Sequence, residues 1–395
     1  MRALEQNVEV RLVARMKESI DALLRDAANH GAISGAVVSV AGVDGMLCES
    51  AAGAVPNATS TVFRIASMTK AVASVAALQL VECGRLDLDA EVCSVIPAFG
   101  DLPVLESFDG DRPRLRAPAR QATVRQLLNH TAGHGYWFTN ALLKRYHEVA
   151  GLPSVLEGTL AGLHAPLVAD PGTRWEYGIN TDWLGRVVEE VSGQTLDAYL
   201  AANVFEPLGM RDATFAPDCQ QRSRLMPISA RSACGAFRPS ELDLPAAPEF
   251  CAAGHGLFAT AHDYTRFMRA LLRGGELDGV RILQADTAEL MFRDSLDGIA
   301  LPEMMHATVP ELSNDVPSAP FRQGWGLGLH LTLEDVPGMR GAGTGDWAGL
   351  FNTFYWIDRR AGIAAVMLTQ VLPFFDYGVV ETLLALEATV YSQRF

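Results

Sequence analysis

The stretch from residue 63 to residue 70 decides how the chain is interpreted; it reads Phe63-Arg64-Ile65-Ala66-Ser67-Met68-Thr69-Lys70. Apolar residues at helical spacing continue beyond it and predict a helix over 67–83, with Ser67 in the first turn. Lys70 then lies one turn further along the same face. In this arrangement an uncharged amine can accept the Ser67 proton, while the helix N-terminus and the Ser67 amide stabilise an oxyanion.

Lysine is rare in this chain, which has only Lys17, Lys70 and Lys144 among its 32 basic residues. Arginine stays protonated in proteins, whereas a desolvated lysine can lose its proton and act as a base. Lys70 is therefore the candidate base. On spacing alone, a structural serine followed by a surface lysine remains an equal alternative.

Charge and composition narrow the classes of partner. The 395 residues carry a formal net charge of −14, which argues against nucleic acid and anionic membranes as partners. We find neither a secretory signal nor the roughly 18–20 apolar residues of a bilayer span. Six scattered cysteines predict reduced core thiols, not a disulfide framework or a zinc site. We expect a cytoplasmic protein with no metal or cofactor; its oligomeric state stays open.

Hydrophobic periodicity places strands near both ends of the chain and helices between them. The expected strands are residues 36–41, 46–52, 326–331, 351–357 and 363–369. The expected helices include residues 8–29, 67–83, 183–191, 196–204, 261–273 and 376–391. Two stretches rich in Pro and polar residues, 101–122 and 302–322, are expected to be loops.

The simplest assembly of these elements is an α+β fold with one antiparallel sheet flanked by helices. We expect residues 1–75 and 262–395 to form this sheet subdomain. Residues 76–261 would form an inserted, mainly helical subdomain. The active site would then lie in the cleft between the two.

Four motifs in this order resemble those of the β-lactamase-like serine hydrolase superfamily. The closest resemblance is to the family VIII carboxylesterases, which are similar to class C β-lactamases. The motifs are the stretch 63–70, Leu127-Leu128-Asn129-His130-Thr131-Ala132-Gly133, Trp175-Glu176-Tyr177-Gly178-Ile179-Asn180, and Asp346-Trp347-Ala348-Gly349-Leu350-Phe351-Asn352-Thr353. The resemblance covers about residues 20–390 and implies a β-lactamase-like fold.

The resemblance also implies roles for single residues. Ser67 would be acylated, Lys70 would help to deprotonate it, and Tyr177 would relay a proton to and from the leaving group. The backbone N–H groups of Ser67 and Leu350 would form the oxyanion hole. Which of Lys70 and Tyr177 holds the proton at rest stays open, because the two groups titrate together.

Four further residues are candidates for substrate binding. Trp347 and Gly349 belong to the fourth motif, where Trp347 would form a pocket wall or simply pack the sheet edge. Asn180 lies one position beyond the place where class C enzymes hold the substrate amide. His255 belongs to a glycine-rich segment that could line the cleft. A zinc site at His130 and His134 is improbable, because the glutamate of a metal-hydrolase motif is missing.

Departures from the class C pattern favour esters as substrates. Class C enzymes carry Lys-Thr-Gly where this chain has Trp347-Ala348-Gly349, so a cation that attracts carboxylates is replaced by an aromatic wall. An apolar pocket favours neutral acyl groups. We expect a carboxylesterase for short-chain or small hydrophobic esters, with weak β-lactam hydrolysis. The alternatives are an acyltransferase or amide hydrolase on the same scaffold, and a non-catalytic relative that binds a ligand.

Overall fold

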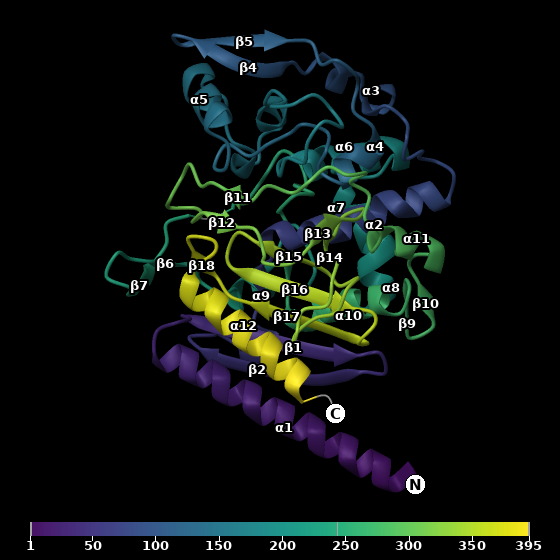
Figure 1. Ribbon diagram of the computed structural model, residues 1–395, viewed down its shortest axis with the longest axis vertical. Coiled ribbons are helices and arrows are strands. Elements are labelled where there is room, and N and C mark those ends of the chain that lie inside the picture. Colours follow the sequence, from purple (N-terminus) through teal and green to yellow (C-terminus); the bar gives the residue numbers. More distant parts are fainter. Residues whose placement is uncertain (1, 243, 394–395) are drawn as a thin grey trace.

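The centre of the computed structural model, which describes residues 2–242 and 244–393, is a seven-stranded antiparallel sheet. Its strand order is β13-β14-β15-β16-β17-β1-β2. The bounds are β1 (Gly35–Gly42), β2 (Met46–Gly53), β13 (Gln323–Trp325), β14 (His330–Thr332), β15 (Gly345–Gly349), β16 (Thr353–Asp358) and β17 (Ile363–Leu368). Because β1 pairs with β17, strands from both ends of the chain share one sheet, as Figure 1 shows.

Helices cover both faces of this sheet, and the strands alternate accordingly. On one face, Val38 and Trp356 pack with α1 (Arg2–Asn29) and α12 (Tyr377–Ser392), which lie side by side in Figure 1. On the other face, Val37 and Val366 belong to the core that includes α10 (Ala261–Leu272). The predicted α+β, β-lactamase-like fold is confirmed.

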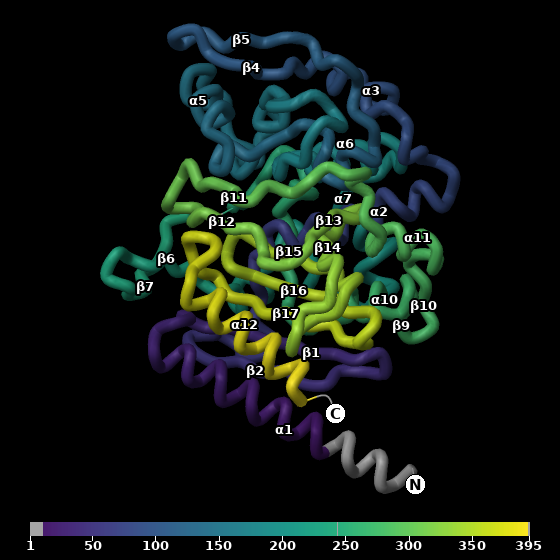
Figure 2. Tube along the Cα trace, in the orientation of Figure 1, coloured from purple at the N-terminus to yellow at the C-terminus, as the bar shows by residue number. Residues whose placement is uncertain are grey.

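The segment between β2 and β13 holds most of the other helices, and its residues 92–192 form the upper part of Figure 2. Its longest helices are α2 (Thr69–Glu82) and α6 (Asn180–Ser192), which pack against each other. The others are α3 (Val92–Val95), α4 (Val124–Leu128), α5 (Ala141–Ala150), α7 (Leu196–Leu200), α8 (Glu206–Leu208), α9 (Cys219–Ser223) and, after α10, α11 (Ala285–Met291). The subdomain boundaries at 75/76 and 261/262 stay a prediction.

Two expectations about local structure are wrong. Residues 326–331 are not one strand, because Gly326–Leu329 turns the chain between β13 and β14. Gly326 approaches the Met291 carbonyl too closely for a side chain, and Gly328 has φ +100°. Residues 101–122 are not all loop: they contain a hairpin of β4 (Val104–Asp109) and β5 (Arg112–Arg116), in which Pro113 is tolerated because both strands are edge strands.

The second expected loop, residues 302–322, holds two short paired strands, β11 (Met304–Met305) and β12 (Val316–Pro317), and is otherwise irregular. The remaining short strands are β3 (Phe63–Arg64), β6 (Ser229–Arg231), β7 (Phe237–Pro239), β8 (Phe258–Ala259), β9 (Glu276–Leu277), β10 (Val280–Arg281) and β18 (Val371–Leu372). Of these, β3 and β8 matter most here, because their pairing lies next to Ser67.

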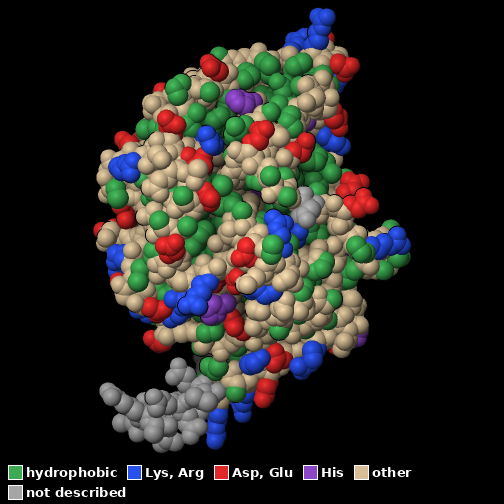
Figure 3. Space-filling view, turned by 180° about the vertical axis from the view of Figure 1, so that it is seen from behind, with side chains coloured by type: hydrophobic (Ala, Val, Ile, Leu, Met, Phe, Trp, Pro, Cys, Tyr) green, Lys and Arg blue, Asp and Glu red, His purple; other side chains and the backbone are tan. Residues whose placement is uncertain are grey.

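The exposure of the cysteines differs from the expectation that they are core residues. Cys48 is buried, but Cys83, Cys219 and Cys234 are exposed, so the thiols are not generally core residues. On the face that Figure 3 shows, positive and negative side chains are interspersed among hydrophobic ones. Within residues 2–242 and 244–393, none of the helices combines the length and the apolar character that a membrane crossing requires.

Candidate active site

Ser67 lies in a tight turn that precedes the helix. Residues 66–68 form a single 3-10 turn and α2 begins at Thr69, two residues later than the sequence predicts. Ala66 has φ +44°, a conformation that non-glycine residues rarely adopt and that often marks functional sites. The Thr69 hydroxyl donates to the Ala66 carbonyl over 2.6 Å and stabilises this turn.

Lys70 is the centre of a buried hydrogen-bond network. Its side chain is 2% exposed, and its amine donates to Ser67 Oγ over 3.2 Å. It also donates to Tyr136 Oη over 3.0 Å and to the Gly254 carbonyl over 2.8 Å. These three partners hold the amine in one place. A base within hydrogen-bonding distance of a serine hydroxyl meets the geometric requirement for nucleophile activation.

The pairing of β3 with β8 brings the Gly254 carbonyl to Lys70. Ile65 N donates to the Leu257 carbonyl over 3.0 Å, and Leu257 N donates to Thr69 Oγ1 over 3.1 Å. These bonds fasten the segment around Gly254 to the turn that carries Ser67.

Asp182 holds Gly254 from the other side. Its Oδ1 accepts the Gly254 N–H over 2.9 Å, and the carboxylate is fully buried. A side chain at position 254 would lie 2.3 Å from Asp182 Oδ2, so this position needs glycine. The chain Asp182, Gly254, Lys70 therefore places a negative charge close to the amine without direct contact.

Tyr136 is a site residue that the sequence analysis missed. It is buried, and its pKa is raised well above 10 by desolvation first and then by the charge of Asp182. Tyr136 reaches Lys70 because the loop around Gly135 packs closely on Gly178, where an added Cβ would lie 2.3 Å from the His134 carbonyl. In the sequence, Gly135 and Gly178 are the signal for this close packing. No spacing rule predicts that Tyr136 contacts Lys70, which lies 66 positions earlier in the chain.

Tyr177 contacts Lys70 and Trp347 in different ways. Its ring faces Lys70, with the amine 4.8 Å from the ring centroid. Its hydroxyl accepts a hydrogen bond from Trp347 Nε1 over 3.0 Å. Tyr177 therefore links the buried amine to strand β15, and the structure brings Ser67, Lys70, Tyr177 and Trp347 together.

Gly349 allows β15 to lie against the turn that carries Ser67. A Cβ at this position would lie 2.4 Å from the Ile65 carbonyl and 2.3 Å from Thr353 Oγ1. The Thr353 hydroxyl itself donates to the Ile65 carbonyl over 3.2 Å. Close packing of strand and turn places Leu350, the next residue, beside Ser67, and both residues line the same two cavities.

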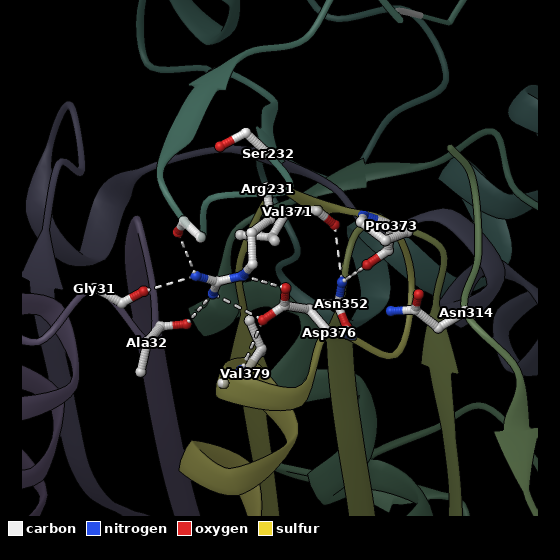
Figure 4. Close-up of polar contacts among 12 residues, drawn as sticks. Gly31, Ala32, Arg231, Ser232, Asn314, Asn352, Val371, Pro373, Asp376 and Val379 are labelled. Carbon is white, nitrogen blue, oxygen red and sulfur yellow. Dashed lines mark hydrogen bonds and ion pairs between the residues drawn. The ribbon is translucent and has the colours of Figure 1, made fainter. Parts of the chain in front are cut away.

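The turn after Leu350 is anchored by a polar cluster, drawn in Figure 4. Asn352, at φ +56°, donates to the carbonyls of Val371 and Pro373 and accepts the Asp376 N–H. The Asp376 carboxylate caps α12 and forms an ion pair with Arg231. This cluster fixes the chain directly after Leu350.

Asn180 and His255, two of the residues expected to bind substrate, lie in different places relative to the cavities at Ser67. Asn180 is fully buried at the start of α6, where its amide nitrogen contacts His130 Nδ1 and the His134 and Glu176 carbonyls. It lines neither cavity beside Ser67, so it holds the Tyr177 loop and does not reach the space for substrate, contrary to the expectation. His255 does line one cavity, and burial lowers its pKa, so the imidazole is neutral.

Two cavities meet at Ser67. The larger has a volume of about 480 Å³ and a mainly hydrophobic lining that includes Trp175, Tyr177, Leu301, Met305 and Trp347. The smaller has a volume of about 20 Å³. Its lining consists of Ala66, Ser67, Tyr136, Phe138, Leu156, Leu242, Leu244, His255, Leu350 and Phe351. Ser67, Phe138 and Leu350 line both cavities.

Comparison with known proteins places this geometry in a family. Residues 20–389 match the family model described as Beta-lactamase. The chain is 34% identical over 352 residues to monacolin J acid methylbutanoyltransferase from Aspergillus terreus, covering 86% of this chain and 84% of that protein. It is 33% identical over 384 residues to lovastatin esterase from Penicillium rubens, covering 90% and 93%.

A solved structure agrees with these relatives. Simvastatin synthase from Aspergillus terreus superimposes with a TM-score of 0.81 at 29% identity, covering 95% of this chain and 98% of the other. The relatives are acyl-transferring or hydrolytic serine enzymes, and this chain holds a serine, a buried amine and two tyrosines in one site. The chain belongs to the Beta-lactamase family, and it is an enzyme of the β-lactamase-like serine hydrolase superfamily.

Proposed function

We propose that this protein forms an acyl-enzyme on Ser67 and transfers the acyl group to an alcohol, with water as a competing acceptor. The observation that carries the proposal is the 3.2 Å contact between the Lys70 amine and Ser67 Oγ inside a buried network. A buried amine held within hydrogen-bonding distance of a serine hydroxyl meets the geometric requirement for a base that takes its proton.

The remaining steps use groups on both sides of Ser67. As Ser67 attacks an ester carbonyl, the backbone N–H groups of Ser67 and Leu350 stabilise the oxyanion. The proton accepted by Lys70 is returned to the departing alcohol, and we assign the relay to the hydroxyl of Tyr177, which lines the larger cavity and accepts a hydrogen bond from Trp347. An incoming alcohol or water then reverses the same steps and releases the acyl group.

Two observations support an alcohol as the acceptor. The larger cavity is mostly apolar, which suits the carbon skeleton of an alcohol better than bulk water. The relative with the higher identity carries a methylbutanoyltransferase name. The second candidate function is ester hydrolysis, favoured by the lovastatin esterase that matches most of the chain. β-Lactam hydrolysis stays a weak side activity, because Trp347 provides no cation for a carboxylate.

Product analysis separates the two candidates. Wild-type enzyme is given p-nitrophenyl butyrate and rising concentrations of 1-naphthylmethanol, and butyric acid and naphthylmethyl butyrate are quantified by mass spectrometry. We expect the ester product to rise with the alcohol at the expense of the acid. Acid alone at every alcohol concentration would make the protein a hydrolase. No turnover by wild type beyond that of Ser67→Ala would contradict both functions.

A further inference from the structure

The smaller cavity at Ser67 contains a buried imidazole, that of His255, which the proposed acyl transfer does not use. We infer that this cavity binds the water that hydrolyses the acyl-enzyme, with His255 as the general base and Asp182 as the residue that positions the imidazole. The inference rests on the proposed acyl-enzyme at Ser67. It gives water a second route to the acyl group, beside the one that it shares with the alcohol through Tyr177.

The volume and the lining of the smaller cavity suit one water molecule. Its volume of about 20 Å³ exceeds the roughly 10–15 Å³ that a water needs and is too small for a larger acceptor. A buried water also needs about two to four polar partners. Among the described residues that line this cavity, Ser67, Tyr136 and His255 carry polar side chains, and the others are apolar.

Tyr136 and His255 offer this water one donor and one acceptor. The Tyr136 hydroxyl accepts from Lys70, and desolvation holds its pKa well above 10, so it keeps a proton that it can donate. Burial lowers the pKa of His255, with Asp182 opposing and Lys70 adding to this effect, so the imidazole is neutral and one ring nitrogen can accept. A water held in this way keeps a lone pair for the acyl carbon on Ser67.

Asp182 determines which nitrogen of His255 carries the proton. His255 Nδ1 lies 3.6 Å from Asp182 Oδ1, and both side chains are buried. Although this distance is too long for a hydrogen bond, the carboxylate favours the tautomer with the proton on Nδ1, which leaves Nε2 as the acceptor. Within residues 2–242 and 244–393, neither His255 Nδ1 nor Asp182 Oδ2 has a hydrogen-bond partner. The carboxylate is therefore available to stabilise the imidazolium that forms during the reaction.

The hydrolytic step returns every group to its starting state. His255 Nε2 takes one proton from the water as the water oxygen bonds to the acyl carbon, and the carbonyl electrons move to the oxygen held by the Ser67 and Leu350 N–H groups. The bond from the acyl carbon to Ser67 Oγ then breaks, Oγ takes the proton from the imidazolium, and the free acid leaves. His255 and Ser67 can exchange this proton because they line the same water-sized cavity.

Two variants test the water site independently. His255→Gln keeps a polar side chain but has no nitrogen that accepts a proton. Leu156→Phe keeps His255 and fills the cavity with a larger side chain; Leu156 lines the cavity from the short turn Val155–Glu157 and is only partly buried. His164→Gln is the matched control, since His164 is exposed and lines neither cavity.

The experiment measures how the butyryl group divides between acceptors, after thermal melts show that each variant is folded. Each protein receives p-nitrophenyl butyrate with 1-naphthylmethanol at a fixed concentration, and mass spectrometry quantifies butyric acid and naphthylmethyl butyrate. We expect the ester-to-acid ratio to rise about tenfold or more in His255→Gln and in Leu156→Phe, because hydrolysis alone loses its base or its water. Acid formation without the alcohol should fall by the same factor. His164→Gln should match wild type.

Hydroxylamine distinguishes loss of a base from a disturbed site, because it attacks an acyl group without a general base. In place of the alcohol, it should give butyrohydroxamate with His255→Gln at the wild-type rate. An equal fall of acid, ester and hydroxamate in His255→Gln would show a merely structural role and overturn the inference. An unchanged ester-to-acid ratio in His255→Gln would exclude the base, and an unchanged ratio in Leu156→Phe would place the water elsewhere.

Mass measurement of Ser67 in the wild type separates failure of this inference from failure of the proposed function. If Ser67 carries a butyryl group while His255→Gln forms acid at the wild-type rate, the water site is wrong and the acyl-enzyme stands. If no butyryl group forms on Ser67 while the ester is turned over, the proposed function itself fails.

Discussion

The site has two walls that consist of different kinds of residue. The buried wall consists of Lys70, Tyr136, Asp182 and Gly254, which are linked by hydrogen bonds of 2.8–3.0 Å and shielded from water. The sheet wall is β15 with Leu350, whose residues from Trp347 to Leu350 line the larger cavity. Because groups that hold and move protons lie in one wall and groups that define shape in the other, we expect reaction rate and substrate choice to respond to separate substitutions.

Tyr177 connects the two walls. Its ring contacts the Lys70 amine and its hydroxyl accepts from Trp347. The proposed proton relay uses this hydroxyl, which lies on the side of the sheet wall. Substitutions in each wall, and at Tyr177 between them, therefore test the comparison.

The largest effect is expected where the walls meet. Ser67→Ala should lower ester turnover by about 10⁴-fold or more, because it removes the nucleophile. Initial rates with p-nitrophenyl butyrate measure the effect, and circular dichroism checks folding. Ser313→Ala is the control, since Ser313 lines the larger cavity without contacting Lys70. Turnover that survives in Ser67→Ala would place the nucleophile elsewhere.

In the buried wall, Lys70→Arg should lower kcat by roughly 10²-fold or more. Arginine keeps the positive charge but does not accept a proton at working pH. Lys144→Arg, at a lysine that donates to the Thr308 carbonyl, should leave the rate unchanged. A near-normal rate in Lys70→Arg would reduce the role of the amine to electrostatic stabilisation.

The two tyrosines should differ although both contact Lys70. Tyr177→Phe should lower kcat about 10²-fold, since it removes the relay to the alcohol. Tyr136→Phe should lower it about tenfold, because Lys70 keeps Ser67 Oγ and the Gly254 carbonyl as acceptors. Single-turnover kinetics compare the two variants. A larger loss in Tyr136→Phe would assign the relay to the buried wall.

Asp182→Asn should shift the pH profile more than the maximal rate. Asparagine can still accept the Gly254 N–H, so the change removes charge while keeping the contact. The Asp182 charge adds to the burial that raises the pKa of Tyr136, and it opposes the burial that lowers the pKa of His255. Loss of this charge lowers the pKa of both groups. We expect kcat/KM to move to lower pH; an unchanged profile would show that Asp182 acts through geometry alone.

The smallest effect is expected in the sheet wall. Trp347→Phe keeps an aromatic ring but loses the hydrogen bond to Tyr177, so kcat/KM should fall only several-fold. Trp347→Lys should raise the ratio of β-lactam to ester turnover by restoring a cation there. A rate panel with a chromogenic cephalosporin and a butyrate ester measures both. A Trp347→Phe loss as large as that of Lys70→Arg would contradict the separation of the two walls.

The sequence predicted the parts of the site that follow local rules. Ser67 and Lys70 are one helical turn apart, and Tyr177 and Trp347 belong to motifs with recognisable order. The contact of Lys70 with Gly254 arises instead from the pairing of β3 with β8 across nearly 200 residues, which no local pattern predicts. Asn180 was predicted to bind substrate because of its distance along the chain from Tyr177. Because α6 begins at Asn180, its side chain is fully buried and bonds to His130.

The same contrast applies to the fold. The largely apolar, almost fully buried runs of β1, β16 and β17 made the central sheet predictable. The Gly326–Leu329 turn was mistaken for a strand, because its Gly-Leu alternation imitates a strand while the glycines serve close packing on Met291 and a positive φ. The local sequence pattern was misleading at positions where a tertiary contact, and not the secondary structure, requires the residue.

One measurement tests the central claim most directly. Wild-type enzyme is mixed with p-nitrophenyl butyrate, quenched in acid and digested with trypsin, which releases the short peptide between Arg64 and Lys70. We predict that this peptide carries one butyryl group, that fragmentation places it on Ser67 and not Thr69, and that the adduct disappears in Ser67→Ala. A butyryl group on another residue, or turnover with no adduct on this peptide under conditions that trap the intermediate, would contradict the account.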